Sequence, residues 1–257
     1  MFPNFIILLE ALMGSIYKRL AEILDTIPEG YPATESGVEL KILEKLFTEE
    51  EAEITCHMEL APLTAKQIAE RMGREERDTF VKLKKMFKKG LVDMKRADGG
   101  LGFKMIPFVV GFYENQNANI DKEFAELFEA YFHEGFHKMM KVKPAIHRVI
   151  PVNKTIPLDI EVMPHERASD IISKAKSWGV LNCICRIQQE KVGKRCNHSI
   201  YNCLTFSSKP NAFDKAEYID AITHEQAEEV LEKAREEGLV HTAKNVRDGL
   251  SYICNCC

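Results

Sequence analysis

The distribution of cysteine constrains this chain more than any other feature of its sequence. Of its eight cysteines, seven lie in the last third of the 257 residues. These seven are Cys183, Cys185, Cys196, Cys203, Cys254, Cys256 and Cys257. Thiolate sulfur binds soft metal ions and iron-sulfur clusters, so this part of the chain is predicted to hold an inorganic cofactor. The eighth cysteine, Cys56, stands alone and is predicted to be a buried, small apolar side chain.

The first residues lack the features of an export signal. The apolar run from Phe5 to Met13 contains Glu10 and follows no basic segment, and it is shorter than the roughly 20 apolar residues that cross a bilayer. We therefore expect a cytoplasmic protein without a membrane partner, whose free cysteines serve metal or redox chemistry. Met13 is an alternative start of translation, because a clear helical pattern follows it.

The composition is that of a globular protein, with 45 % hydrophobic and 29 % charged residues. A formal net charge of -4 argues against a protein that coats nucleic acid through its bulk charge. The length permits two modest domains. We predict an α+β protein with a winged-helix-like domain over residues 1–110, a long connecting helix over 111–143 and a small α/β cysteine-rich domain over 144–257.

The first domain is predicted to contain several helices followed by a hairpin. Apolar residues recur at helical spacing from Ser15 onward. Capping pairs mark three further helix starts, namely Ser36 with Glu39, Thr48 with Glu51 and Thr64 with Gln67. A helix over residues 74–90 ends at Gly90, and two short apolar segments then flank Asp98-Gly99-Gly100. Helix, turn, helix and hairpin in this order are typical of a winged helix-turn-helix.

The last helix and the hairpin of this domain are locally basic. Between residues 65 and 96, Lys and Arg outnumber Asp and Glu by about two to one, which permits contact with a phosphate backbone. Acidic side chains at residues 75–78 would repel DNA at the end of the helix that normally contacts bases. Lys82, Lys85 and Lys89 are equally explained as a solvated helix face. DNA binding is therefore an alternative and not the favoured function.

A helical stretch over residues 112–141 contains the pattern H-E-x-x-H, formed by His133, Glu134 and His137. Two histidines one helical turn apart can bind zinc, with the glutamate as a general base. Gly135 weakens the helix inside this pattern, and no distinctive third ligand follows. A zinc hydrolase is the least favoured of the three functions.

The second domain is predicted to alternate strands with helices. Strands are expected at residues 145–152, 158–163, 180–187, 239–246 and 251–257, and helices at 165–179 and 223–238. In this arrangement the cysteines lie at strand ends and on one loop, where a redox partner can reach a bound cluster.

The spacing of the cysteines favours an iron-sulfur cluster over zinc, which stays the alternative cofactor. Zinc sites usually present two Cys-x-x-Cys turns, and this sequence does not contain such a pair. Dispersed thiolates can enclose a cubane cluster, and seven cysteines exceed the need of one zinc ion. The nearby positive charges that would offset an anionic cluster are Arg186, Lys194, Arg195 and His198.

Segments along nearly the whole chain resemble a family of 4Fe-4S ferredoxin-type proteins found mainly in anaerobic bacteria and archaea. These segments are YKRLAEILDTIPEGYPATESGVEL, MIPFVVGFYENQ, HRVIPV, NCICRIQQEKVGKRCNHSIYNCLTFSS, GLVHTAKNV and YICNCC. The resemblance implies a winged-helix-like domain followed by a cysteine-rich domain. It also implies a ferredoxin module beyond the N-C-C segment, so a chain that stops at Cys257 is expected to be truncated.

The resemblance further implies a first 4Fe-4S cluster bound by Cys183, Cys185, Cys196 and Cys203. The remaining three, Cys254, Cys256 and Cys257, would begin a second site or exchange with one of the four. The predicted function is electron transfer with a redox partner protein, as a carrier or as a subunit of an anaerobic redox system. No catalytic residue is predicted. The alternative is a DNA-binding regulator with a cysteine domain that senses a cluster or metal.

Overall fold

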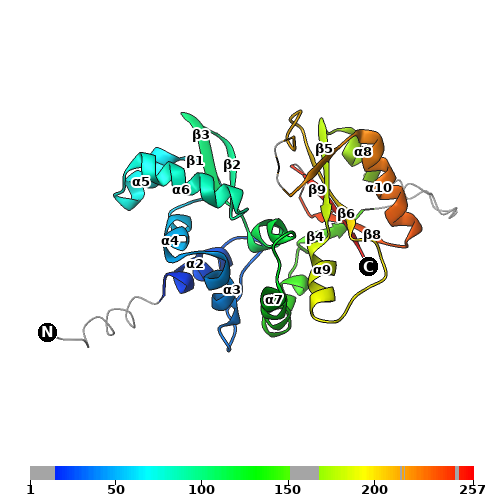
Figure 1. Ribbon diagram of the computed structural model, residues 1–257, viewed down its shortest axis with the longest axis horizontal. Coiled ribbons are helices and arrows are strands. Elements are labelled where there is room, and N and C mark those ends of the chain that lie inside the picture. Colours follow the sequence, from blue (N-terminus) through cyan, green and yellow to red (C-terminus); the bar gives the residue numbers. More distant parts are fainter. Residues whose placement is uncertain (1–14, 151–167, 215, 217, 247–248) are drawn as a thin grey trace. The chain divides into compact units, whose positions relative to one another are not determined.

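The computed structural model describes residues 15–150, 168–214, 216, 218–246 and 249–257 (Figure 1). Helices and antiparallel sheets make up the chain, which confirms the predicted α+β class. The chain divides into two compact units. The first extends to Met140 except for residues 117–120, which belong with residues 141–257 in the second. Within the described ranges, no helix is both long and apolar enough to cross a membrane.

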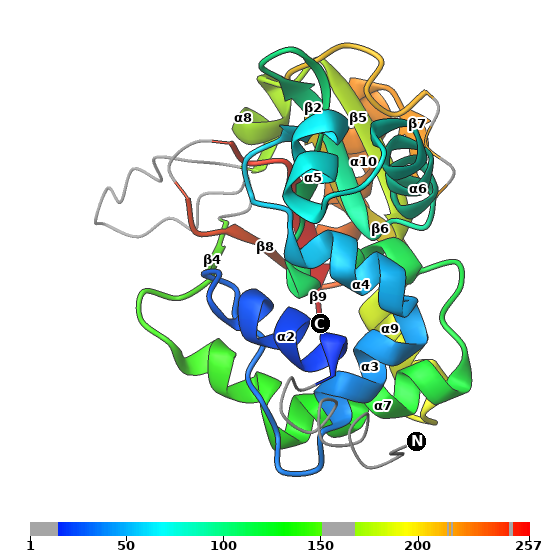
Figure 2. The same ribbon diagram turned by 90° about the vertical axis from the view of Figure 1, so that its left-hand side faces the viewer.

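The first unit is mostly helical and contains one small sheet (Figure 2). Its α-helices are α2 (Ile16–Asp25), α3 (Val38–Leu46), α4 (Glu49–Cys56), α5 (Ala65–Met72), α6 (Glu76–Lys88) and α7 (Lys122–Glu134). Its strands are β1 (Leu63–Thr64), β2 (Val92–Ala97) and β3 (Gly100–Met105), which pair antiparallel in the order β1-β3-β2. A helix, turn, helix and hairpin therefore follow one another from α5 to β3. The assignment of this order to a winged helix stays a prediction.

Two of the three predicted capping pairs form. Thr48 and Thr64 cap α4 and α5 in reciprocal hydrogen bonds with the third residue of each helix. The prediction for Ser36 and Glu39 is wrong, because α3 begins after Gly37, whose φ of +68° suits glycine. The Glu39 carboxylate accepts a hydrogen bond from the Thr34 backbone instead.

The stretch predicted as one connecting helix is divided in the structure. Short turns at Phe108–Phe112 and Glu114–Gln116 precede α7. The Asp121 side chain accepts a hydrogen bond from the Phe124 backbone and starts α7, which ends before Gly135. Because α7 packs against α3, it belongs to the first unit rather than to a linker.

The second unit is built on a six-stranded antiparallel sheet in the order β4-β8-β9-β6-β5-β7. Its strands are β4 (His147–Val149), β5 (Ser177–Asn182), β6 (Tyr201–Ser207), β7 (Asp220–Ile222), β8 (Val240–Lys244) and β9 (Tyr252–Cys256). Its helices are α8 (Ala168–Ser173), α9 (Ile184–Lys191) and α10 (His224–Glu236). The strand predicted at residues 158–163 lies outside the described residues.

The two faces of this sheet have different chemistry, because side chains alternate along each strand. Leu204, Phe206 and Ile253 point to one face, where they form a core with residues of α8 and α10. Figure 1 shows these two helices beside the sheet. Cys203 precedes Leu204 in β6 and Cys254 follows Ile253 in β9, so both cysteines point to the opposite face, outside this core. The sheet thus separates an apolar core from a thiol-bearing surface.

Candidate functional site

Two neighbouring strands place cysteines side by side. Leu204 of β6 pairs with Ile253 of β9 in antiparallel register, which brings Cys203 opposite Cys254. The thiols of Cys203 and Cys254 are hydrogen-bonded to each other, and Cys254 also bonds Cys256 two residues along the same strand face. One sheet face therefore carries three linked thiols.

The start of α9 adds two more thiols. The strand predicted over residues 180–187 ends at Asn182, where β5 gives way to α9 with Cys183 as the N-cap residue. Cys185 falls in the first turn of the helix, and its thiol is hydrogen-bonded to that of Cys183. A helix N-terminus favours negative charge, so this placement suits thiolates.

Cys196 and Cys257 form a third pair of hydrogen-bonded thiols. Cys196 belongs to the loop between α9 and β6, and Cys257 follows β9 directly. The contacts thus join members of the two predicted groups, since Cys203 bonds Cys254 and Cys196 bonds Cys257. All seven C-terminal cysteines have a thiol partner among themselves; we call this set the thiol cluster.

The thiols differ in their tendency to ionise. The Cys183 pKa falls to about 6, first because the Cys185 thiol bonds its thiolate and further because Arg186 lies nearby. A hydrogen bond from Cys254 likewise lowers the Cys256 pKa to about 6, and the Thr242 hydroxyl lies 3.7 Å from its sulfur. Hydrogen bonds to the sulfurs of Cys203 and Cys256 raise the Cys254 pKa well above its usual value. Protons and negative charge are therefore shared within the cluster.

Arg186 is the cation of this site. Its side chain comes from α9 and is 5 % exposed, with Nη1 donating to Asn202 Oδ1 at 2.9 Å and Nη2 to the Asn255 carbonyl at 2.9 Å. Its Nε has no partner among the described residues. The charge of this guanidinium interacts most strongly with the sulfurs of Cys183, Cys196 and Cys257. A buried cation is stable only beside negative charge, which the thiols supply here.

A buried polar network holds this guanidinium in place. Asn255 Nδ2 donates to the Asn202 carbonyl at 2.6 Å, and Asn255 Oδ1 accepts from His241 Nδ1 at 2.6 Å. Burial lowers the His241 pKa, so its ring is neutral at physiological pH. These three side chains are each 3 % exposed and connect β6, β8 and β9. The network fixes the strands that carry the thiols.

The other predicted basic residues have peripheral roles. Arg195 pairs with Glu190 at 3.1 Å, with 74 % of its side chain exposed. His198 lies 3.7 Å from Glu237. The residue pattern indicates Arg186 only as one of several charges near the cysteines, and it does not indicate Asn202, Asn255 or His241. The alternation of Cys254, Asn255 and Cys256 is the one signal that could have located a buried amide between two thiols.

Two other sequence features do not join this site. Cys56 lies in the first unit, where burial raises its pKa to about 11 and keeps it protonated. In the H-E-x-x-H pattern, α7 ends at Glu134, so His137 lies beyond the helix. The Glu134 carboxylate accepts a hydrogen bond from Ser36 at 2.6 Å, while His133 lies 3.3 Å from Glu129. These residues do not converge on one point.

In the part of the chain that the structure describes, no group of three or more His, Cys, Asp or Glu side chains is arranged to hold a single metal ion. No family model, curated protein or solved structure matches this chain. The site is therefore interpreted from its own chemistry.

The pKa differences predict an order of thiol reactivity in the cofactor-free protein. Because the thiolate is the reactive form, Cys183 and Cys256 should reach half-maximal alkylation by iodoacetamide near pH 6, whereas Cys254 should need strongly alkaline pH. Peptide mass spectrometry after short exposures from pH 5 to 10 measures each site, and Cys56 provides an unreactive internal standard. Equal pH profiles for Cys183 and Cys254 would contradict the hydrogen-bonding scheme.

Proposed function

We propose that this chain binds an iron-sulfur cluster of the 4Fe-4S type through the thiol cluster and transfers single electrons to or from a partner protein in the cytoplasm. The observation that carries this proposal is the buried Arg186 guanidinium, whose Nε is unpartnered among the described residues and whose anionic neighbours are thiolates. A cluster bound by four thiolates is an anion with sulfur acceptors, and it would satisfy both the charge and the donor.

The donor set supports this cofactor. Seven thiols are available for the four ligand positions of one cluster. The first candidates are Cys183, Cys185, Cys196 and Cys203. In a cubane each thiolate binds a different iron, so the four sulfurs need not converge on one point. Cys254 and Cys256 are alternative ligands, because Cys254 already bonds Cys203 across the sheet.

The protein residues would tune and present the cluster. When bound, the cluster supplies the redox chemistry. Arg186 holds a fixed positive charge beside it and would raise the reduction potential, because positive charge favours the more negative, reduced form. Cys185, Cys256 and Cys257 are exposed, so one side of the site is accessible to a partner.

The resemblance to the 4Fe-4S ferredoxin-type family agrees with this proposal. We further infer that α4 to α6 and the β2–β3 hairpin form a winged helix, which is supported by the order of elements and by the β1-β3-β2 sheet.

Redox titration of the anaerobically reconstituted full chain tests electron transfer. We expect a broad visible absorption band that bleaches on reduction, returns on reoxidation and follows a one-electron Nernst curve. Irreversible loss of the band on the first reduction, or no change over the range of ferredoxin potentials, would rule out an electron carrier.

A further inference from the structure

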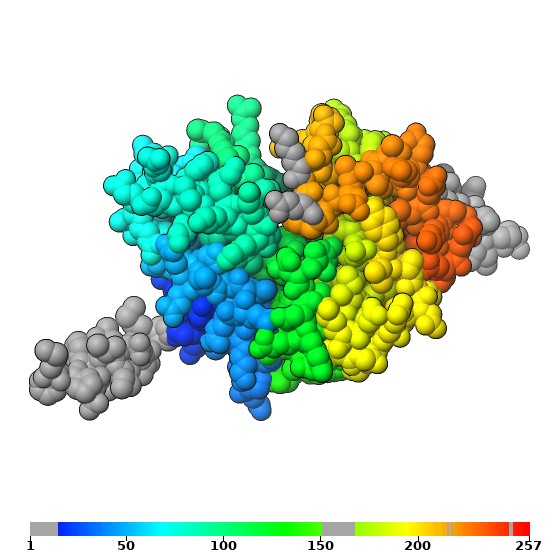
Figure 3. All heavy atoms as spheres, in the orientation of Figure 1, coloured from blue at the N-terminus to red at the C-terminus, as the bar shows by residue number. Residues whose placement is uncertain are grey.

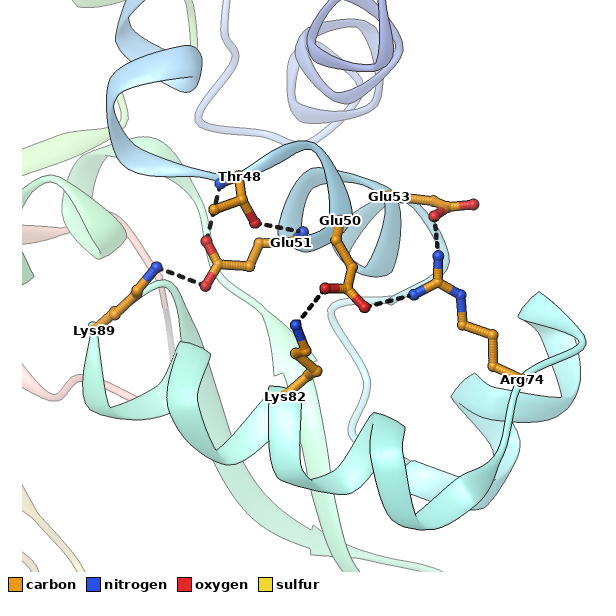
Figure 4. A network of polar contacts seen from close by, with 7 residues as sticks. All are labelled: Thr48, Glu50, Glu51, Glu53, Arg74, Lys82 and Lys89. Atoms are coloured by element: carbon orange, nitrogen blue, oxygen red, sulfur yellow. Dashed lines mark hydrogen bonds and ion pairs between the residues drawn. The ribbon is translucent and has the colours of Figure 1, made fainter.

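Helix α6 carries two sets of basic side chains with different environments. The first set is neutralised by α4, where Lys89 lies 2.7 Å from Glu51 and Lys82 contacts Glu50 (Figure 4). Arg74, just before α6, joins this set through Glu50 at 2.9 Å. These cations attach the helix to α4, and the carboxylates of Glu50 and Glu51 offset their positive charge.

The second set faces solvent. Three basic residues of this set, Arg77, Lys84 and Lys88, lie in one line along α6 together with the apolar Val81, because the four recur at helical spacing of four, three and four residues. All four are exposed, and the surface of this region is cyan in Figure 3. Among the described residues, no ion pair involves the three cations of this line. We call these four residues the α6 stripe.

The hairpin lies beside the α6 stripe. Phe80 of α6 is 37 % exposed and packs edge-on against Phe103 of β3, with 5.9 Å between ring centroids. The adjacent strand β2 carries Arg96, which is exposed, and Lys95, which is exposed but lies 3.6 Å from Asp93. Arg96 of the hairpin thus extends the positive surface of the stripe.

We propose that the α6 stripe and the β2–β3 hairpin bind the phosphate backbone of duplex DNA. Cations without a carboxylate partner contribute favourable binding free energy when they displace counterions from the phosphates of DNA. A helix beside a hairpin also fits the surface of a duplex. Glu75, Glu76 and Asp78 make acidic the start of α6, which is the end from which a recognition helix contacts base edges. The contact is therefore to the backbone rather than to the bases, and it is independent of sequence.

The experiment compares two substitution sets on the same helix. Fluorescence anisotropy with a labelled 20-base-pair duplex of random sequence measures the affinity of the full chain at several salt concentrations. For the variant Arg77→Ala, Lys84→Ala and Lys88→Ala, we expect at least tenfold weaker binding. The slope of log affinity against log salt should fall by about two to three, since each lost phosphate contact removes roughly 0.9.

The matched control is Lys82→Ala with Lys89→Ala, which removes charge from the neutralised set of the same helix. It should keep duplex affinity within about threefold, because these cations already contact carboxylates. Circular dichroism confirms that both variants are folded. Unchanged binding in the triple variant, equal losses in both variants, or preference for anionic phospholipid vesicles over the duplex would overturn the proposal.

This inference is independent of the thiol cluster. Substitution of Cys203 and Cys254 by serine should leave duplex binding unchanged, since these residues belong to the second unit. A chain that forms a cluster but does not bind the duplex would contradict only this inference.

Discussion

Replacing Arg186 with methionine is expected to slow alkylation of Cys183 at pH 6.5 by about threefold, because a rise of about one unit from a pKa of about 6 lowers the thiolate fraction by that factor. The guanidinium stabilises the Cys183 thiolate, and methionine fills similar space without charge. A thiolate that loses its cation can take up a proton near neutral pH. The change also removes the donors from Asn202 Oδ1 and the Asn255 carbonyl, so a loss of stability accompanies the change in ionisation.

The matched control for this change is Arg195→Met, because Arg195 follows the same helix and its side chain is largely exposed. Its Cys183 pH profile should equal that of the native chain. Arg186→Lys should fall between the two, since an ammonium keeps the charge but lacks the fork that bonds Asn202 and Asn255 together. An unchanged profile in Arg186→Met would show that Arg186 does not govern the thiols.

Replacing Asn255 with alanine is expected to lower the free energy of unfolding of the second unit by about 2–5 kcal/mol. The change leaves His241 Nδ1 and the Asn202 carbonyl without their partner, and each buried orphan costs about 1–3 kcal/mol. Trp178 is the only tryptophan of the chain and packs against the core of this unit, so its fluorescence follows urea unfolding there.

Asn197→Ala provides the comparison for Asn255, because it removes the same side chain from an exposed position in the same unit. It should change the free energy of unfolding by less than about 0.5 kcal/mol. If both asparagine variants unfold at the same urea concentration, the buried network does not stabilise the strands around the thiols.

The sequence predicted the elements whose local signals are strong. Thr223 with Gln226 caps α10 as a reciprocal pair, and α10 ends just before Gly238 as expected. The strands at residues 239–246 and 251–257 correspond to β8 and β9. In these places apolar periodicity and capping chemistry agree, so no distant contact is needed to identify the element.

Other elements depend on tertiary contacts that the sequence does not reveal. β6 was not predicted, although Leu204 and Phe206 alternate in it, because the surrounding cysteines and polar residues suggested a loop. The turn at Cys183 was also missed, since its apolar neighbours extend the strand pattern of β5. Only pairing across the sheet determines where these segments bend.

The candidate site was predicted in its residue types but not in its arrangement. The spacing in the sequence assigns Cys196 and Cys203 to one group of ligands and Cys254 and Cys257 to another. In the sheet, the register of β6 and β9 instead places Cys203 beside Cys254. The central position of Arg186 follows from the orientation of α9. This orientation cannot be derived from a group of basic residues close together in the sequence. Pairing of strands that are distant in the sequence thus brings the thiols together, which local sequence patterns do not reveal.

Anaerobic reconstitution with iron and sulfide decides whether the thiols bind a cluster. Iron, zinc and acid-labile sulfide are measured with the visible spectrum for the native chain, Cys56→Ser, and the double variant Cys203→Ser with Cys254→Ser. We expect about four irons and four sulfides per chain in the first two, and loss of both in the double variant. Zinc without sulfide in the native chain, or full iron and sulfide in the double variant, would contradict an iron-sulfur site built on these strands.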